Sequence, residues 1–240
     1  MCLRTRYWLD EDALSSPGDY LCPGRDGQRS GGETYAIQTA ETEAGASVFD
    51  ALAFARRQFS ASEPAEIVIW LVRENGPEPL TIRPESTLDQ SGWPAVYMNG
   101  SGRDQLGFQA AHEVFHVLLT PVSTRHWTHE VGAVIFSLAY LDSAGARDTQ
   151  FRTYRADQIE KAGQRAKDFP VENLMRAEQP YPEVFYDRAI LFGLQLIDIV
   201  GPAGYYGIVK PGPSGLPDFW AWVDTKPAKL RRRIESIAPR

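Results

Sequence analysis

The feature that most constrains the fold is the stretch "AAHEVFHVLL", residues 110–119, which holds two histidines four positions apart. On an α-helix, residues four apart lie on one face, so His112 and His116 can offer both imidazoles to one ion. The neighbouring residues are mostly apolar and predict a largely buried helix over about residues 104–120. Because unpaired polar groups are costly in apolar surroundings, this helix favours a metal site over a chance match.

The composition is that of a globular protein with a sizeable core. The chain has 240 residues, 43% of them hydrophobic, and a net charge of −6. An acidic balance argues against a general nucleic-acid binder, whose surface is usually basic. No stretch reads as a signal peptide or a membrane span, so we expect a cytoplasmic protein without a membrane partner. Cys2 and Cys22 lack the spacing of a metal motif and are expected to be reduced.

The order of the patterns predicts an α+β fold. Residues 1–33 are rich in glycine, serine and proline and read as an irregular segment with one short strand at Tyr7–Leu9. Residues 34–240 are expected to form a single catalytic domain. Its α/β lobe (34–122) would hold a small, mostly antiparallel sheet packed on the histidine helix, and its helical lobe (123–240) would face it across an active-site cleft.

Individual elements follow from periodicity and from β-branched runs. Strands are expected at residues 34–39, 66–72, around "LTIRP" and around "PAVYMNG". Helices are expected at about residues 46–60, 104–120, 127–142, 149–167, 184–200 and 227–237.

Zinc is the ion that this spacing favours, because it accepts neutral imidazole nitrogen and a catalytic zinc site keeps one position for water. Glu113 follows the first histidine, about 100° further around the helix axis. Its carboxylate is the candidate general base, which would take a proton from water and deliver it to a leaving amine. Zinc would lower the pKa of that water and polarise the substrate carbonyl.

A catalytic zinc usually has three protein ligands, so one more is needed. The extended pattern HExxHxxGxxH requires glycine at position 119 and histidine at position 122. The chain has Leu119 and Val122 there, which excludes that class. The remaining candidates lie shortly downstream and are His126, His129 and Glu130.

Glu130 is favoured among these because the small residues Gly132 and Ala133 follow it and allow two helices to approach closely. "HEVFH" followed by "WTHEVGA" also resembles the gluzincin zinc peptidases, especially the aminopeptidase-N-like and minigluzincin forms. Their second motif reads roughly W-x-x-E-G-x-A. Trp127, Glu130 and Ala133 match it in register, whereas Val131 stands in the place of its glycine.

The resemblance covers about residues 45–201 and implies a role for each matching residue. It implies that His112, His116 and Glu130 bind one Zn²⁺ and that Glu113 is the base. It also implies an oxyanion donor at a tyrosine that opens a later helix, here Tyr186 in "YDRAILFGLQLIDIVG". Other tyrosines and His126 remain alternatives for that donor.

Peptide substrates of such enzymes pair with an edge strand beside the histidine helix. "AVYMNG", residues 95–100, is the candidate edge, which makes Tyr97 and Asn99 candidate substrate-binding residues. The aminopeptidase motif G-x-M-E-N is missing its glutamate here, so endopeptidase activity on a peptide or protein is favoured. The alternative is a non-catalytic metal-binding or interaction domain on the same scaffold.

Overall fold

The computed structural model describes the main helices and strands of the chain. The described residues are 26–28, 34–37, 42–59, 68–73, 80–82, 95–98, 100, 102–118, 126–177, 181–201, 204–209 and 218–238. In the strands it describes the backbone together with the side chains of Val96 and Met98. The strand expected at Tyr7–Leu9 and both cysteines lie outside the described residues.

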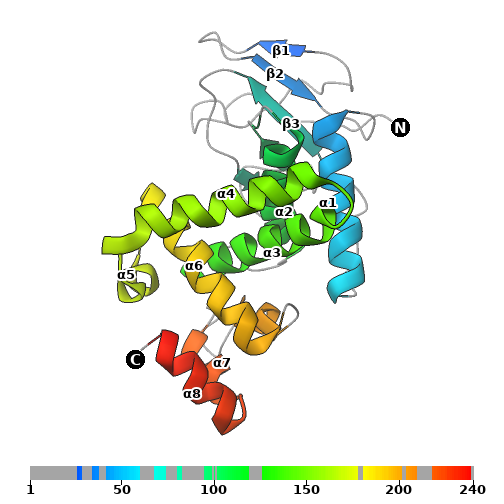
Figure 1. Cartoon of the computed structure of the whole chain (residues 1–240). Coiled ribbons are helices and arrows are strands. Elements are labelled where there is room, and N and C mark those ends of the chain that lie inside the picture. The colour runs from blue at the N-terminus through cyan, green and yellow to red at the C-terminus, as the bar shows by residue number, and fades with distance from the viewer. Residues whose placement is uncertain are drawn as a thin grey trace, which may run out of the picture. The chain divides into compact units, whose positions relative to one another are not determined.

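The chain divides into two compact units, residues 1–123 and 124–240. In Figure 1 the first unit runs from blue to green and the second from green to red. That the predicted lobes belong to a single catalytic domain stays a prediction.

In the first unit, helix α1 (Glu43–Phe59) packs on α2 (Arg103–Leu118). The buried face of α1 combines alanines such as Ala51 and Ala55 with the larger Val48. Small side chains at a helix contact permit a short distance between the axes. The helix that carries the two histidines is therefore held against a partner within its own unit.

Five short strands form one sheet in the order β1-β2-β3-β5-β4. They are β1 (Asp26–Gln28), β2 (Thr34–Ile37), β3 (Val68–Arg73), β4 (Leu80–Ile82) and β5 (Ala95–Met98). β3 and β5 pair in parallel and the other pairs are antiparallel. β5 has a neighbour on each side, so the prediction that it is an edge strand is wrong. β4 pairs with the other side of β5 and forms that edge of the sheet.

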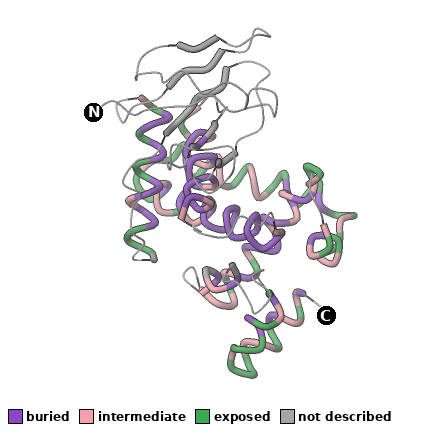
Figure 2. The backbone as a smooth tube through the Cα atoms, turned by 180° about the vertical axis from the view of Figure 1, so that it is seen from behind, coloured by how far each residue is buried: buried purple, intermediate pink, exposed green. Residues whose placement is uncertain are grey.

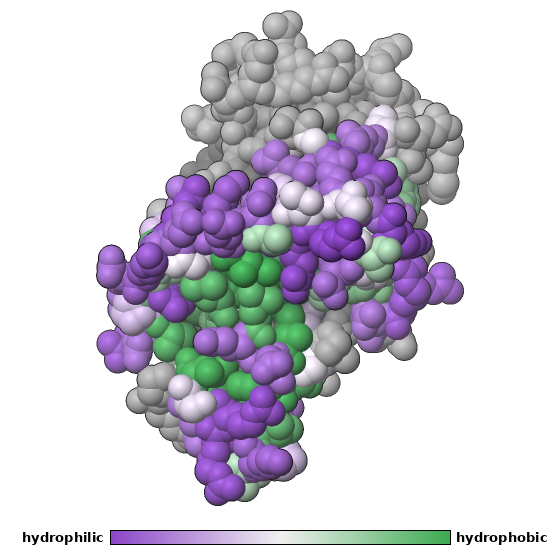
Figure 3. Space-filling view, viewed as in Figure 1, coloured by the Kyte–Doolittle hydropathy of each residue, from purple (hydrophilic) through white to green (hydrophobic). Residues whose placement is uncertain are grey.

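The second unit is a group of helices around α3 (Trp127–Gly145). The others are α4 (Thr149–Arg165), η2 (Ala166–Asp168), α5 (Val171–Arg176), α6 (Glu183–Val200), η3 (Gly204–Val209), α7 (Phe219–Asp224) and α8 (Ala228–Ile237). α3 is buried along most of its length (Figure 2). α4 buries only Phe151 and Ala162, and hydrophilic side chains cover it in Figure 3. A helix that is apolar nearly all round belongs in a core, so α3 is the central element of this unit.

α3 and α6 pack closely where glycine faces isoleucine. A Cβ atom added to Gly193 of α6 would lie 2.6 Å from Cγ1 of Ile135 on α3. Near the start of α3, the Trp127 ring packs on Phe192 and Phe219, with ring centroids 6.3 and 5.3 Å away. These contacts fix the first turn of α3 against α6 and α7.

The predicted α+β class is wrong, because the described residues are mostly helical. The strands have three to six residues each, whereas α1, α2, α3, α4 and α6 have 16 to 19. Of the buried apolar side chains that the structure describes, the strands supply Val96 and Met98 and helical segments supply almost all the others. Helix-on-helix packing therefore builds the described core. The β-branched runs led us to overestimate the share of the sheet.

The six helices expected from periodicity are confirmed to within three residues at each end. The short α5 and α7, each six residues long, were missed because so few residues show no period. Within the described residues, no helix is both long and apolar enough to cross a membrane.

Candidate metal centre

The two histidines of α2 face each other. Their Nε2 atoms are 3.2 Å apart, the ring centroids are 5.0 Å apart and the ring planes meet at 68°. Two nitrogens bound tetrahedrally to one zinc at 2.0–2.1 Å would be about 3.3 Å apart. The separation of the two Nε2 atoms therefore fits a shared zinc ion. It also fits a hydrogen bond between the imidazoles if one Nε2 carries the proton.

The packing of α2 explains why these two side chains lie where they do. The buried side of the helix is apolar and includes Ala110, Val114 and Phe115, each with no exposed surface, while His112 and His116 are half-buried. The buried Gln109 holds the start of the helix, because its Oε1 accepts a hydrogen bond of 2.8 Å from the backbone N–H of Gly100. The imidazoles thus lie at the margin of the buried face, where a ligand from solvent can reach them.

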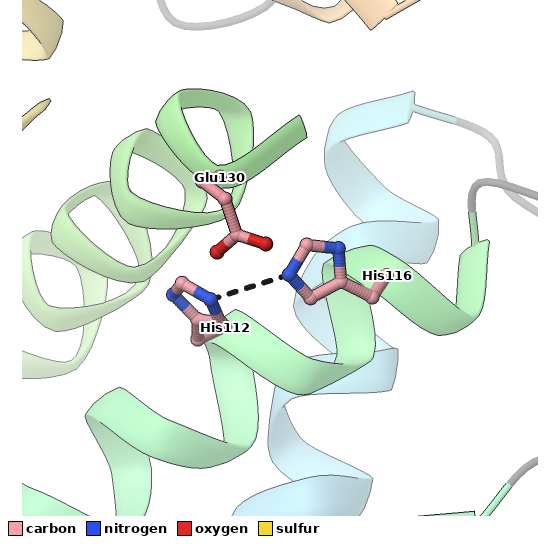
Figure 4. A group of neighbouring side chains, drawn as sticks. All are labelled: His112, His116 and Glu130. Atoms are coloured by element: carbon pink, nitrogen blue, oxygen red, sulfur yellow. Dashed lines mark hydrogen bonds between the residues drawn. The ribbon is translucent and has the colours of Figure 1, made fainter. Parts of the chain in front are cut away.

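Glu130 lies in the first turn of α3 and is 9% exposed. A carboxylate there is favoured by the partial positive charge at a helix N-terminus. One ligand atom from each of His112, His116 and Glu130 can be chosen so that all three lie within 4.8 Å of one another. In Figure 4 the Glu130 carboxylate points toward the two imidazoles. The group contains neither His126 nor His129, the two alternative ligands.

Glu113, the candidate base, is 2% exposed and so more deeply buried than the histidines on either side of it. Its place next to His112 turns it toward the buried side of α2. Its role as the base stays a prediction.

Tyr186, the candidate oxyanion donor, is half-buried in the first turn of α6. Its ring meets those of Phe185 and Tyr181 edge-on, with centroids 5.3 and 6.5 Å away. These contacts position the ring, and the role of its hydroxyl stays a prediction. The side chain of Tyr97 and all of Asn99 lie outside the described residues. Since β5 is not an edge strand, the reason for assigning these two residues to substrate no longer holds.

His126 is the N-cap of α3, which the sequence did not show. Its Nδ1 accepts a hydrogen bond of 3.3 Å from the backbone N–H of Thr128 and lies 2.7 Å from the Oγ1 of that residue. Burial lowers the pKa of His126 and the negative charge of Asp218 partly offsets this effect. Burial therefore favours the neutral form of the imidazole. The only signal in the sequence is the triplet His-Trp-Thr before an apolar run.

Asp187 is a second buried polar residue that the sequence patterns did not indicate. It lies in α6, is 8% exposed, and its Oδ2 has no hydrogen-bond partner among the described residues. Burial raises the pKa of this carboxyl, Arg165 lowers it and Glu183 raises it further. An acidic residue within the apolar stretch of α6 was the only available signal.

Comparison with protein-family models, with curated proteins and with solved structures finds no match. A function for this chain is therefore inferred from its own side chains.

Proposed function

We propose that the chain is a zinc-dependent peptidase in which His112, His116 and Glu130 bind one Zn²⁺ and Glu113 is the general base. The observation that carries the proposal is the pair of Nε2 atoms 3.2 Å apart on one face of α2, which is close to the spacing that a tetrahedral zinc imposes. The resemblance of the two motifs to gluzincin peptidases supports the same assignment.

The donor set fits zinc chemically. Two imidazole nitrogens and one carboxylate oxygen form the set found in a major group of zinc hydrolases, and three protein ligands leave a fourth position for water. Harder ions such as Mg²⁺ and Ca²⁺ prefer sets of oxygens alone. When bound, zinc supplies Lewis-acid activation of water and of the substrate carbonyl.

The residues of the chain supply the proton transfers and the positioning. In the proposal, Glu113 accepts a proton from the attacking water and returns it to the nitrogen of the leaving amine, so that it begins and ends the cycle as a carboxylate. Its low exposure keeps competing solvent away from the carboxylate. Tyr186 would donate its hydroxyl proton in a hydrogen bond to the developing oxyanion.

The substrate class in this proposal is an internal peptide bond. The motif that anchors a free amine in the aminopeptidases is missing its glutamate in "VYMNG". The proposed location is the cytoplasm.

A second candidate is a non-catalytic metal-binding domain, and one observation favours it. Glu113 is 2% exposed, and a carboxylate so enclosed can also serve as a structural hydrogen-bond acceptor. The two candidate functions predict different cleavage activities for the wild type and for one variant of Glu113.

The test compares wild type with Glu113→Gln, which preserves the shape of the side chain but removes the base. Each protein is assayed for bound zinc by atomic absorption and for cleavage of fluorescent casein. The proposal predicts one zinc per chain in both proteins and a fall in cleavage of about 10²- to 10⁴-fold in the variant. Glu160→Gln, the same change at an exposed site on α4, is the matched control and should leave cleavage unchanged.

Bound zinc without cleavage by the wild type would contradict the peptidase proposal and leave the metal-binding domain. A purified protein without stoichiometric zinc would contradict both.

A further inference from the structure

Helix α8 lies in a strongly basic segment of an otherwise acidic chain. Residues 226–240 hold six of the 25 lysines and arginines but only one of the 31 aspartates and glutamates, which gives them a net charge of +5. The rest of the chain therefore carries −11. Because salt screens charges that are more than about 8–10 Å apart, such a segment attracts anionic groups locally even though the whole molecule is acidic.

Three basic side chains of α8 form one exposed face of the helix. Lys229, Arg232 and Arg233 are exposed, and both arginines lie three or four residues after the lysine, which places all three on one side. Another side of α8 is anchored by Ile234, which has no exposed surface, and the helix packs on α6 within the second unit. Hydrophilic side chains cover α8 in Figure 3. We call Lys229, Arg232 and Arg233 the basic stripe.

The charges of the basic stripe are poorly neutralised by the rest of the described chain. Lys229 and Arg232 form no ion pair with another described residue. Nη2 of Arg233 lies 3.6 Å from Oδ2 of Asp198, whose side chain is 85% exposed. An ion pair so exposed contributes little, because water competes for both charges. Since like charges one turn apart also destabilise a helix, the stripe lowers the stability of α8 and a bound anion would relieve the repulsion.

The chemistry and the size of the stripe favour a short run of carboxylates as its ligand. Two of the three side chains are arginines, whose planar guanidinium groups bind a carboxylate through two parallel hydrogen bonds. α8 has ten residues and is about 15 Å long, which is the length of a few peptide residues. A membrane or a long nucleic acid is much larger than one helix and would also meet parts of the chain that carry the net charge of −11.

We propose that the basic stripe of α8 docks an acidic peptide segment of a partner protein, through ion pairs between Lys229, Arg232 and Arg233 and neighbouring aspartates or glutamates of that segment. The inference is independent of the proposed peptidase function, because the stripe contains none of the candidate metal-binding or catalytic residues.

The test measures binding of fluorescein-labelled hexaglutamate to the full-length protein by fluorescence anisotropy, at an ionic strength of about 0.05 M. The wild type should bind the peptide, and Lys229→Gln/Arg232→Gln should bind it at least about tenfold more weakly, because charge-assisted hydrogen bonds are lost. Arg152→Gln/Lys161→Gln is the matched control. It removes one arginine and one lysine from exposed positions on α4, so it changes the net charge equally and should bind like the wild type.

No binding of hexaglutamate by the wild type, or an equal loss in the two double variants, would overturn the inference. The thermal midpoint separates docking from a structural role. Glutamine has nearly the helix propensity of lysine and arginine, so Lys229→Gln/Arg232→Gln should unfold at the same temperature as the wild type or a higher one. A lower midpoint would show that the stripe supports the fold, and would overturn the inference.

Two further probes separate an acidic peptide from other polyanions. They are labelled hexathymidylate and vesicles of phosphatidylserine and phosphatidylcholine, each compared with hexaglutamate at the same concentration of anionic groups. The wild type should bind hexaglutamate more tightly than either probe. Tighter binding of the oligonucleotide or of the vesicles, with loss of that binding in Lys229→Gln/Arg232→Gln, would overturn the inference and assign the stripe to a nucleic acid or a membrane surface.

Discussion

Helices α2 and α3 both carry candidate zinc ligands, but their polar residues lie in different surroundings. On α2, His112 and His116 are half-buried at the margin of an apolar face, as expected for an amphipathic helix. On α3, every residue from Trp127 to Leu138 is buried, and Glu130 is one of several polar side chains within that stretch. Spacing alone therefore points to the two candidate ligands on α2. On α3, Glu130 stands out as a candidate only when the side chains that surround it are known.

The largest expected effect is the loss of zinc binding when a histidine of α2 is replaced. Replacing His116 with alanine removes one of the two imidazoles and should abolish stoichiometric zinc binding, as measured by atomic absorption after dialysis. Arg103→Ala, at an exposed position on the same helix, is the control and should retain zinc. Unchanged zinc content in His116→Ala would show that the α2 pair is not the metal site.

The contribution of α3 to zinc binding should be smaller than that of α2 but measurable. Glu130→Gln keeps the size of the side chain and replaces the anionic ligand by a neutral amide. We expect zinc affinity, measured by competition with a chelator, to fall by at least about 10- to 100-fold, the loss typical even for residues that only support a ligand. An unchanged affinity would show that Glu130 is not the third ligand.

The close contact of α3 with α6 gives a test of the second unit alone. Gly193→Ala places a Cβ against Ile135 and should lower the free energy of unfolding by about 1–3 kcal/mol, as overpacking does in cores. Urea unfolding measures it. Gly163→Ala is the matched control: this glycine is exposed on α4 with no atom within 4 Å of the added Cβ, and the change should raise stability by up to about 1 kcal/mol. Equal effects at the two positions would contradict the close packing of α3 on α6.

Asp187→Asn should have the smallest effect, and one that depends on pH. Burial raises the pKa of Asp187 in the folded state, so the folded protein holds this proton more tightly than the unfolded chain. Stability is therefore lost as pH rises from the unfolded pKa through the raised folded pKa. Asparagine should stabilise the protein at neutral pH and give no such gain below about pH 3. Urea unfolding at the two pH values checks this, and a gain that is the same at both would contradict it.

The sequence predicts the helices well because their signals are local. Residues of α2 that lie one turn apart are enough to define its buried face and its histidine pair. The extent of the sheet was overestimated because a β-branched run indicates a strand but not how long the strand is. The strand order, with β5 between β3 and β4, depends on pairings between residues far apart in the sequence. The burial of Asp187 and the role of His126 as N-cap depend on tertiary packing and on side-chain geometry, which periodicity does not encode.

The most direct test of the central claim is an anomalous difference map at the zinc absorption edge, from crystals of the protein grown with zinc. The account predicts one peak per chain, about 2.0–2.1 Å from Nε2 of both His112 and His116, with a carboxylate oxygen of Glu130 as the third protein ligand. Zinc bound without both histidines, or no peak in crystals that contain zinc, would contradict it.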